Sequence, residues 1–207
     1  MQSPVIWTDS MLSYYQEVRV MVLNNEQYLV TILTEITPSL DGYRVIYQAD
    51  GIDMHDFYCA RLIEVKASNG TVSRVTLLDN LISKNEPCAV LEDNVLTVPL
   101  FDTILQIDLE TATIMRCVDC EACGGLEQIF EINQGYLFKG ECDIFYYDKM
   151  LNQVWRFGGR DILARVTEEK CFWIEKDLIH CRDWAGWHYV LDMDGNTISE
   201  FREDTTN

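Results

Sequence analysis

Three cysteines follow one another at intervals of three residues, at Cys117, Cys120 and Cys123. Thiolates at this spacing can surround one metal ion, because zinc accepts three or four sulfur ligands and iron–sulfur clusters take four. Cys142 completes such a set only if the fold brings it close, and the second C-x₂-C half of a zinc ribbon is missing. Two interpretations therefore stay open: a zinc or redox site, and ordinary loop thiols.

A second stretch is unusually dense in rings, with Trp184, Trp187, His188 and Tyr189 close together in the chain. Trp, Tyr and Arg are the residue types that most often anchor protein interfaces. The residues predicted to bind a partner are these rings and their polar neighbours: Trp184, Trp187, His188, Asp183, Arg160 and Asp161. Two alternatives remain, namely that the rings pack between neighbouring sheets, and that Trp184 and Trp187 bind a small molecule or glycan.

Catalytic motifs are missing from the chain. It contains no phosphate-binding glycine loop, no dinucleotide fingerprint, no nucleophile elbow and no His-Glu-x-x-His zinc motif. With 3 histidines in the whole sequence, a histidine-based triad has little room. The sequence therefore predicts a protein that is not an enzyme.

The charge balance is strongly acidic, with 34 Asp and Glu against 16 Lys and Arg, a net charge of −18. Nucleic-acid backbones and anionic membrane surfaces both attract basic proteins, so neither is an expected partner. The charge favours a basic macromolecule as partner. The alternative is that the acidic residues serve solubility alone.

The expected compartment is the cytoplasm. No apolar run approaches the roughly 18 residues that a membrane span needs, and the first residues lack the basic and apolar regions of a signal peptide. The 8 cysteines are then expected to be mostly reduced.

Strand patterns dominate the chain, and three segments share one order of strands, polar breaks and turns: 89–117, 129–157 and 171–201. Each contains a strand that ends in aspartate before a tight turn, at Asp108, Asp148 and Asp192. An aspartate in this position can accept hydrogen bonds from amides two or three residues further on and so fix the hairpin. The sequence therefore predicts a repeat of about 40 residues in which this aspartate stabilises the turn.

The repeat resembles a blade of the β-propellers, in the broad class that includes quinoprotein and WD40 repeats. The resemblance covers about residues 80–201 and rests on the repeat length, the strand–Asp–turn–strand step, and an aromatic residue in the last strand at Trp155 and Phe201. It implies an all-β fold of propeller-like or meander repeats, as a partial or small propeller. The alternative is a β-sandwich followed by a short repeat array.

The N-terminal part also reads as strands. Gln16–Asn24 and Gln27–Ile36 are rich in β-branched and aromatic residues, and the Asn25-Glu26 link suits a hairpin. Residues 1–80 are predicted to form an N-terminal β segment, either a divergent repeat or a small sandwich. Residues 81–207 are predicted to hold three repeats, in a single compact unit.

The leading hypothesis is a non-enzymatic, acidic binding protein that recognises a basic macromolecule, for example an immunity protein that neutralises a toxin. The alternatives are a metal-binding or redox module with zinc at Cys117–Cys123, and a ligand binder at Trp184 and Trp187. The leading hypothesis requires no cofactor. The identity of the partner and the oligomeric state are left open by the sequence.

Overall fold

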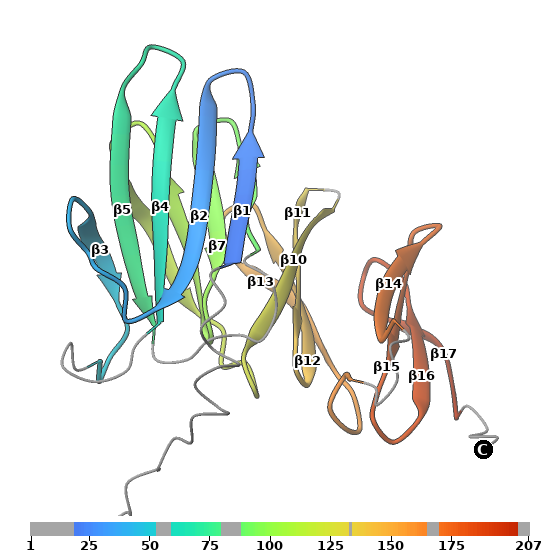
Figure 1. The fold of residues 1–207 in the computed structure, drawn as a ribbon. Helices are drawn as coiled ribbons and strands as arrows, with labels where there is room; N and C mark the ends of the chain where they lie inside the picture. The colour runs from blue at the N-terminus through green and yellow to red at the C-terminus, as the bar shows by residue number, and fades with distance from the viewer. Residues whose placement is uncertain (1–18, 53–58, 80–87, 133, 165–169, 203–207) are drawn as a thin grey trace, which may run out of the picture. The chain divides into compact units, whose positions relative to one another are not determined.

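The computed structural model describes residues 19–52, 59–79, 88–132, 134–164 and 170–202. Within these ranges every regular element is a β-strand, and the strands form four sheets (Figure 1). None of the described residues belongs to a helix that could cross a membrane. The prediction of an all-β, propeller-like fold is confirmed.

The first sheet has five strands in the order β1-β2-β4-β5-β3, with β3 parallel to β5. Its buried face follows from period-two alternation, because Val30 and Ile32 lie opposite Val65 and Ile63 and all four are excluded from solvent. The predicted hairpin at Asn25 is confirmed, since the Asn25 side chain accepts hydrogen bonds from the amides of Gln27 and Tyr28. The strands are β1 (Arg19–Asn24), β2 (Tyr28–Ile36), β3 (Arg44–Gln48), β4 (Cys59–Ala67) and β5 (Val72–Asp79).

The other three sheets are four-stranded and run in chain order, β6 to β9, β10 to β13 and β14 to β17. This up-and-down order is that of a propeller blade. The five-stranded order of the first sheet differs from it. The strands are β6 (Val90–Glu92), β7 (Val95–Pro99), β8 (Thr103–Asp108), β9 (Thr113–Asp119), β10 (Leu126–Ile132), β11 (Gly135–Gly140), β12 (Asp143–Asp148), β13 (Gln153–Gly158), β14 (Phe172–Glu175), β15 (Leu178–Arg182), β16 (Trp187–Leu191) and β17 (Thr197–Arg202).

The repeated aspartate does what the pattern predicts. Asp108 accepts hydrogen bonds from the amides of Glu110 and Thr111, at 2.8 and 2.9 Å. Asp148 and Asp192 each accept from amides two and four residues further on, and their second oxygen accepts from an asparagine side chain four residues on. One carboxylate therefore closes the hairpin between the last two strands of each blade.

We expect this turn to make stability depend on pH. Hydrogen bonds from Asn196, first from its side chain and then from its backbone, lower the pKa of Asp192 below its ordinary value. The stabilisation is therefore present above the ordinary aspartate pKa and is lost as the pH falls through the lowered one. Asp192→Asn removes this titration, so the fall in its thermal midpoint between pH 5 and pH 2 should be smaller than that of the wild type by roughly 1–3 °C. Asp194→Asn, in the same exposed turn, is the control, and an equal change in both variants would contradict the account.

The β10–β13 and β14–β17 sheets share a hydrophobic core. Leu137 and Ile144 of one sheet are buried with Ile179, Cys181 and Leu191 of the other. Cys181 is fully buried among these side chains, and burial raises the pKa of its thiol to about 12. Cys181 therefore acts in this core as a small apolar side chain.

The chain divides into two compact units. The first contains Met1–Thr97 and Gln106–Met115, and the second contains Val98–Leu105 and Arg116–Asn207. The division falls within the β6–β9 sheet, and the boundary expected near residue 80 stays a prediction. The β10–β13 and β14–β17 sheets, with the residues singled out in the sequence for binding, belong to the second unit.

Candidate binding surface

Trp184 lies at the tip of the turn between β15 and β16. The turn is closed by the Asp183 and Trp187 backbones, with the Asp183 amide donating to the Trp187 carbonyl at 3.0 Å. Gly186 takes a φ of +85°, which a side chain would strain. Trp184 is 52% exposed, which is unusual for a residue of this size. The turn therefore presents a large apolar ring to solvent.

The buried side chain of Asp183 stabilises this turn. It is 1% exposed, and its two oxygens accept hydrogen bonds from the Trp187 amide at 2.8 Å and the Tyr189 hydroxyl at 2.7 Å. Burial, followed by the hydrogen bond to Asp183, raises the pKa of Tyr189 to about 12. Asp183 therefore positions the turn, and both of its oxygens are occupied.

Arg160 lies in the segment after β13, and its side chain contacts a residue at the end of this turn. Its guanidinium lies 3.9 Å from the centre of the Trp187 ring and 2.6 Å from the Glu200 carboxylate. These are the distances of a cation–π contact and an ion pair, and both charged side chains are about half exposed. Arg160, Trp184, Trp187 and Glu200 are called the Trp184 patch below.

The loop that carries Arg160 is attached to the turn by its backbone. The Arg160 amide donates to the Tyr189 hydroxyl at 3.1 Å, and the Trp184 amide donates to the Ile162 carbonyl at 2.9 Å. Asp161 is exposed, and its carboxylate accepts a hydrogen bond from the amide of Ile162 in the same loop. The structure therefore brings five of the six predicted residues to one loop and one turn, while their role in binding stays a prediction.

His188 points to the other face of the same sheet, because successive residues of a strand alternate. It is 7% exposed, and its Nε2 lies 3.2 Å from Nδ1 of His180. Trp173 stacks on His180 with ring centres 4.8 Å apart, and Phe201 lies 4.8 Å from His188. His188 therefore belongs to a ring cluster that the sequence reasoning did not assemble, because its members come from four strands whose register was unknown.

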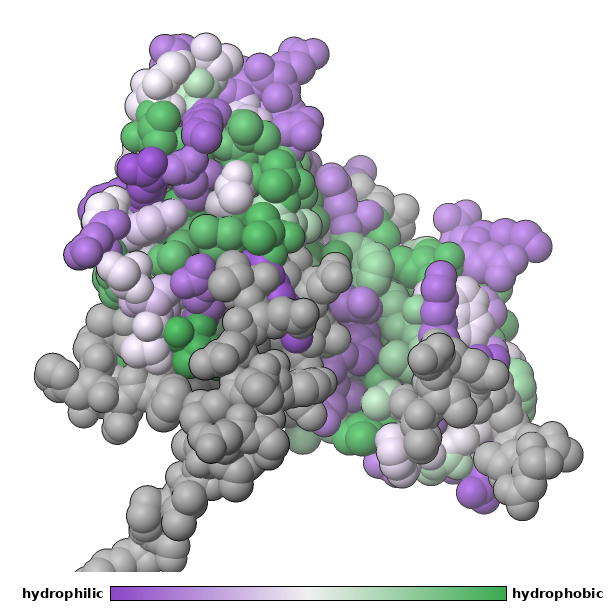
Figure 2. Space-filling view, in the orientation of Figure 1, coloured by the Kyte–Doolittle hydropathy of each residue, from purple (hydrophilic) through white to green (hydrophobic). Residues whose placement is uncertain are grey.

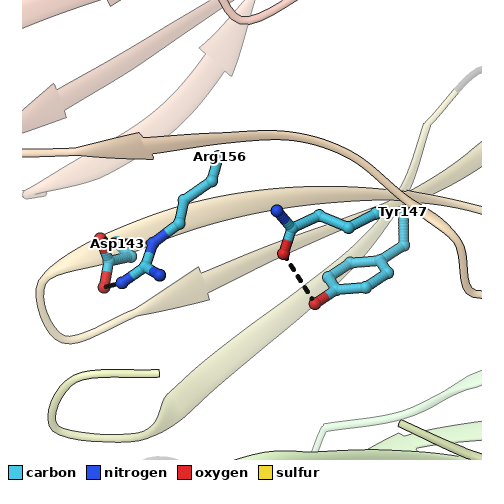
Figure 3. Close-up of polar contacts among 4 residues, drawn as sticks. Asp143, Tyr147 and Arg156 are labelled. Atoms are coloured by element: carbon cyan, nitrogen blue, oxygen red, sulfur yellow. Dashed lines mark hydrogen bonds and ion pairs between the residues drawn. The ribbon is translucent and has the colours of Figure 1, made fainter. Parts of the chain in front are cut away.

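Polar side chains of the β10–β13 sheet contact one another across the β12–β13 hairpin. Figure 3 shows the Arg156 guanidinium on the Asp143 carboxylate, where Nε and one terminal nitrogen donate at 3.1 and 2.8 Å. In the same view the Tyr147 hydroxyl donates to the side chain of Gln153 at 3.1 Å. Burial raises the pKa of Tyr147 to about 12, so it stays neutral. These contacts link the side chains of β12 and β13.

The predicted metal ligands do not meet as a set. Cys117 and Cys123 are exposed, whereas Cys120 is buried and its thiol donates to the Asp102 carbonyl at 2.9 Å. Burial raises the pKa of Cys120 to about 12, which disfavours the thiolate that a metal requires. Across the described parts of the chain, no group of three or more His, Cys, Asp or Glu is placed to hold a metal ion. Zinc ligation by Cys117, Cys120 and Cys123 stays a prediction, and this geometry does not add to it.

Another exposed surface lies on the first sheet. Val20 and Val22 of β1 are 58% and 55% exposed, and Figure 2 shows hydrophobic residues beside hydrophilic ones on the visible side of this sheet. Glu64 on the same sheet pairs with Lys66 and Arg74, and these ion pairs lower its pKa. The surface is therefore mixed in character.

Comparisons with known proteins identify a fold. No family model matches the chain, and no curated protein matches it. Solved structures are similar at 12% identity. Raptor from Chaetomium thermophilum has a TM-score of 0.50 over 92% of this chain and 20% of its own. BamB from Moraxella catarrhalis has a TM-score of 0.47 over 88% of this chain and 63% of its own. The Pan2 WD40 domain of Neurospora crassa has a TM-score of 0.43 over 57% of this chain and 38% of its own.

The chain spans less than two thirds of each of these three proteins. At this identity the likeness concerns the fold alone. The protein has an all-β fold of propeller-like sheets.

Proposed function

We propose that this protein is a non-enzymatic binding protein whose partner is a basic protein. The observation that carries the proposal is the net charge of −18. Such a charge speeds association with a basic surface and selects against acidic competitors. Neutralisation of a cationic toxin in the cytoplasm, as by an immunity protein, is one form that this function takes.

The acidic excess belongs to both units equally. Residues 1–97 and 106–115 hold 15 Asp or Glu and 6 Lys or Arg, a net charge of −9, and the rest of the chain holds 19 and 10, again −9. Long-range attraction therefore does not select one unit over the other. A local feature is needed to fix where the partner lies.

The Trp184 patch supplies such a feature. Tryptophan and arginine are enriched among the residues whose truncation weakens interfaces most. Here the exposed Trp184 belongs to a turn whose backbone is hydrogen-bonded to the loop of the half-exposed Arg160–Glu200 ion pair. Glu200 gives the patch a carboxylate that a partner's lysine or arginine can reach. Arg160 covers one side of the Trp187 ring, so that ring is poorly placed to stack on a sugar.

The proposal is tested by affinity capture from a lysate of the native host at low salt, with a parallel high-salt wash and identification by mass spectrometry. The wild type should retain a basic protein that high salt releases. Trp184→Ala should lower its recovery at least tenfold, because truncation of a central tryptophan costs about 2 kcal/mol or more. Met150→Ala is the matched control, since Met150 is a similarly exposed apolar side chain (57%) in another turn of the same unit.

Equal recovery of every retained protein by the wild type and by Trp184→Ala would remove the Trp184 patch from the proposal. Retention of acidic proteins only, or of none, would overturn the proposal itself.

A further inference from the structure

Two thiols that are distant in sequence are in contact in the second unit. The thiol of Cys142, in the turn between β11 and β12, is hydrogen-bonded to the thiol of Cys123, in the connection between β9 and β10. Cys123 is exposed and Cys142 is partly exposed. The pair is therefore accessible to a small reagent in solution.

The backbone brings these two segments together. The Glu141 amide donates to the Gly125 carbonyl at 3.0 Å. This hydrogen bond lies next to Leu126 and Gly140, the residue pair at which the β10–β11 ladder begins. Gly124 lies so close to Glu141 that a Cβ on it would stand 2.7 Å from the Glu141 Cβ. The Cys142 carbonyl accepts a hydrogen bond from the Gly159 amide at 3.2 Å. The contact between the thiols therefore rests on fixed backbone.

We propose that Cys123 and Cys142 form a dithiol site that is oxidised to a disulfide by thiol–disulfide exchange with a low-molecular-weight disulfide of the glutathione type. The Cys123 thiolate attacks one sulfur of glutathione disulfide, and the first glutathione leaves as a thiolate that takes up a proton. Cys142 then loses its proton and attacks the Cys123 sulfur of the mixed disulfide, which releases the second glutathione. The two cysteines lose two electrons and two protons, and glutathione disulfide gains them.

The order of the two steps follows from exposure. Cys123 is the more exposed thiol, whereas burial and the neighbouring Cys123 raise the pKa of Cys142 to about 11. The attacking species in such exchange is the thiolate. Cys123 therefore reacts with the incoming disulfide, and Cys142 resolves the mixed disulfide.

Other thiols of the chain differ from this pair. Burial raises the pKa of Cys59, Cys120 and Cys181 to about 12 in each case, so they stay protonated and shielded. Cys117 is exposed on β9, and burial followed by the charge of Asp119 raises its pKa. Cys117 is therefore the matched control for exposure.

The experiment treats the reduced full-length protein anaerobically with glutathione disulfide at neutral pH, blocks the remaining thiols, and cleaves after glutamate. Cleavage leaves Cys123 as the one cysteine of peptide 122–127 and Cys142 as the first residue of its own peptide. The expected product is these two peptides joined and two hydrogens lighter than their sum. Cys117→Ser should give the same product, and Cys142→Ser should stop at the mixed disulfide on Cys123.

A second readout covers the case in which Cys142→Ser folds poorly. The link closes the chain between positions 123 and 142, so oxidised wild type should unfold at a temperature roughly 5 °C or more above reduced wild type. Reduction should restore the lower midpoint. Glutathione on Cys123 and Cys117 to the same extent, with no joined peptide and an unchanged midpoint, would overturn the proposal.

Discussion

Asp183→Ala should lower the free energy of unfolding by about 3–4 kcal/mol, which is a large effect for one carboxylate. The substitution removes the acceptor of two hydrogen bonds, from the Trp187 amide and from the Tyr189 hydroxyl. Tyr189 is 2% exposed, so its hydroxyl would lose a partner in a place that water reaches poorly. The measurement is urea unfolding, followed by far-ultraviolet circular dichroism.

The control for this prediction is Asp194→Ala, which removes the same charge from an exposed turn of the same sheet. It should change the free energy of unfolding by no more than about 0.5 kcal/mol. Tyr189→Phe should reproduce part of the Asp183→Ala loss, because it deletes one of the two donors. If Asp183→Ala proved as mild as Asp194→Ala, the account of Asp183 as the residue that holds the turn would be wrong.

Lys139→Met should have the second large effect, a loss of about 3 kcal/mol of unfolding free energy. The Lys139 side chain is 3% exposed and is paired with Glu127, which is 27% exposed. Loss of the ammonium leaves the Glu127 carboxylate in a half-buried position without its cation. Removing one partner of such a pair is more harmful than removing both.

The double variant Lys139→Met/Glu127→Leu tests that reasoning. It should recover most of the stability lost by Lys139→Met alone, because an apolar pair carries no desolvation penalty in this place. The measurement is a double-mutant cycle from urea unfolding. Additive losses in the double variant would show that the lysine contributes through packing alone.

The parts of the fold that could be predicted are those set by local chemistry. Asp108, Asp148 and Asp192 stand out in the sequence because a carboxylate at a strand end can reach amides a few residues away. Period-two alternation likewise gives the buried faces of single strands. These signals need only neighbours in the chain, so they survive without knowledge of the tertiary structure.

The parts that could not be predicted depend on pairing between distant segments. β3 joins the first sheet beside β5 in parallel, and nothing local in Arg44–Gln48 specifies that partner. Register is also what places His188 with Trp173 and Phe201, away from Trp184. The same limit applies to Cys142, which lies far from Cys123 in sequence and meets it through the β10–β11 hairpin.

The most direct test of the proposed function is the association rate of the captured basic partner as a function of ionic strength. For the wild type we expect the rate constant to fall at least tenfold between about 0.02 and 0.5 M salt, because screening removes the long-range attraction of an acidic surface. Trp184→Ala should keep that salt dependence and dissociate at least tenfold faster, while Met150→Ala behaves as the wild type. An association rate that does not change with salt would contradict the account.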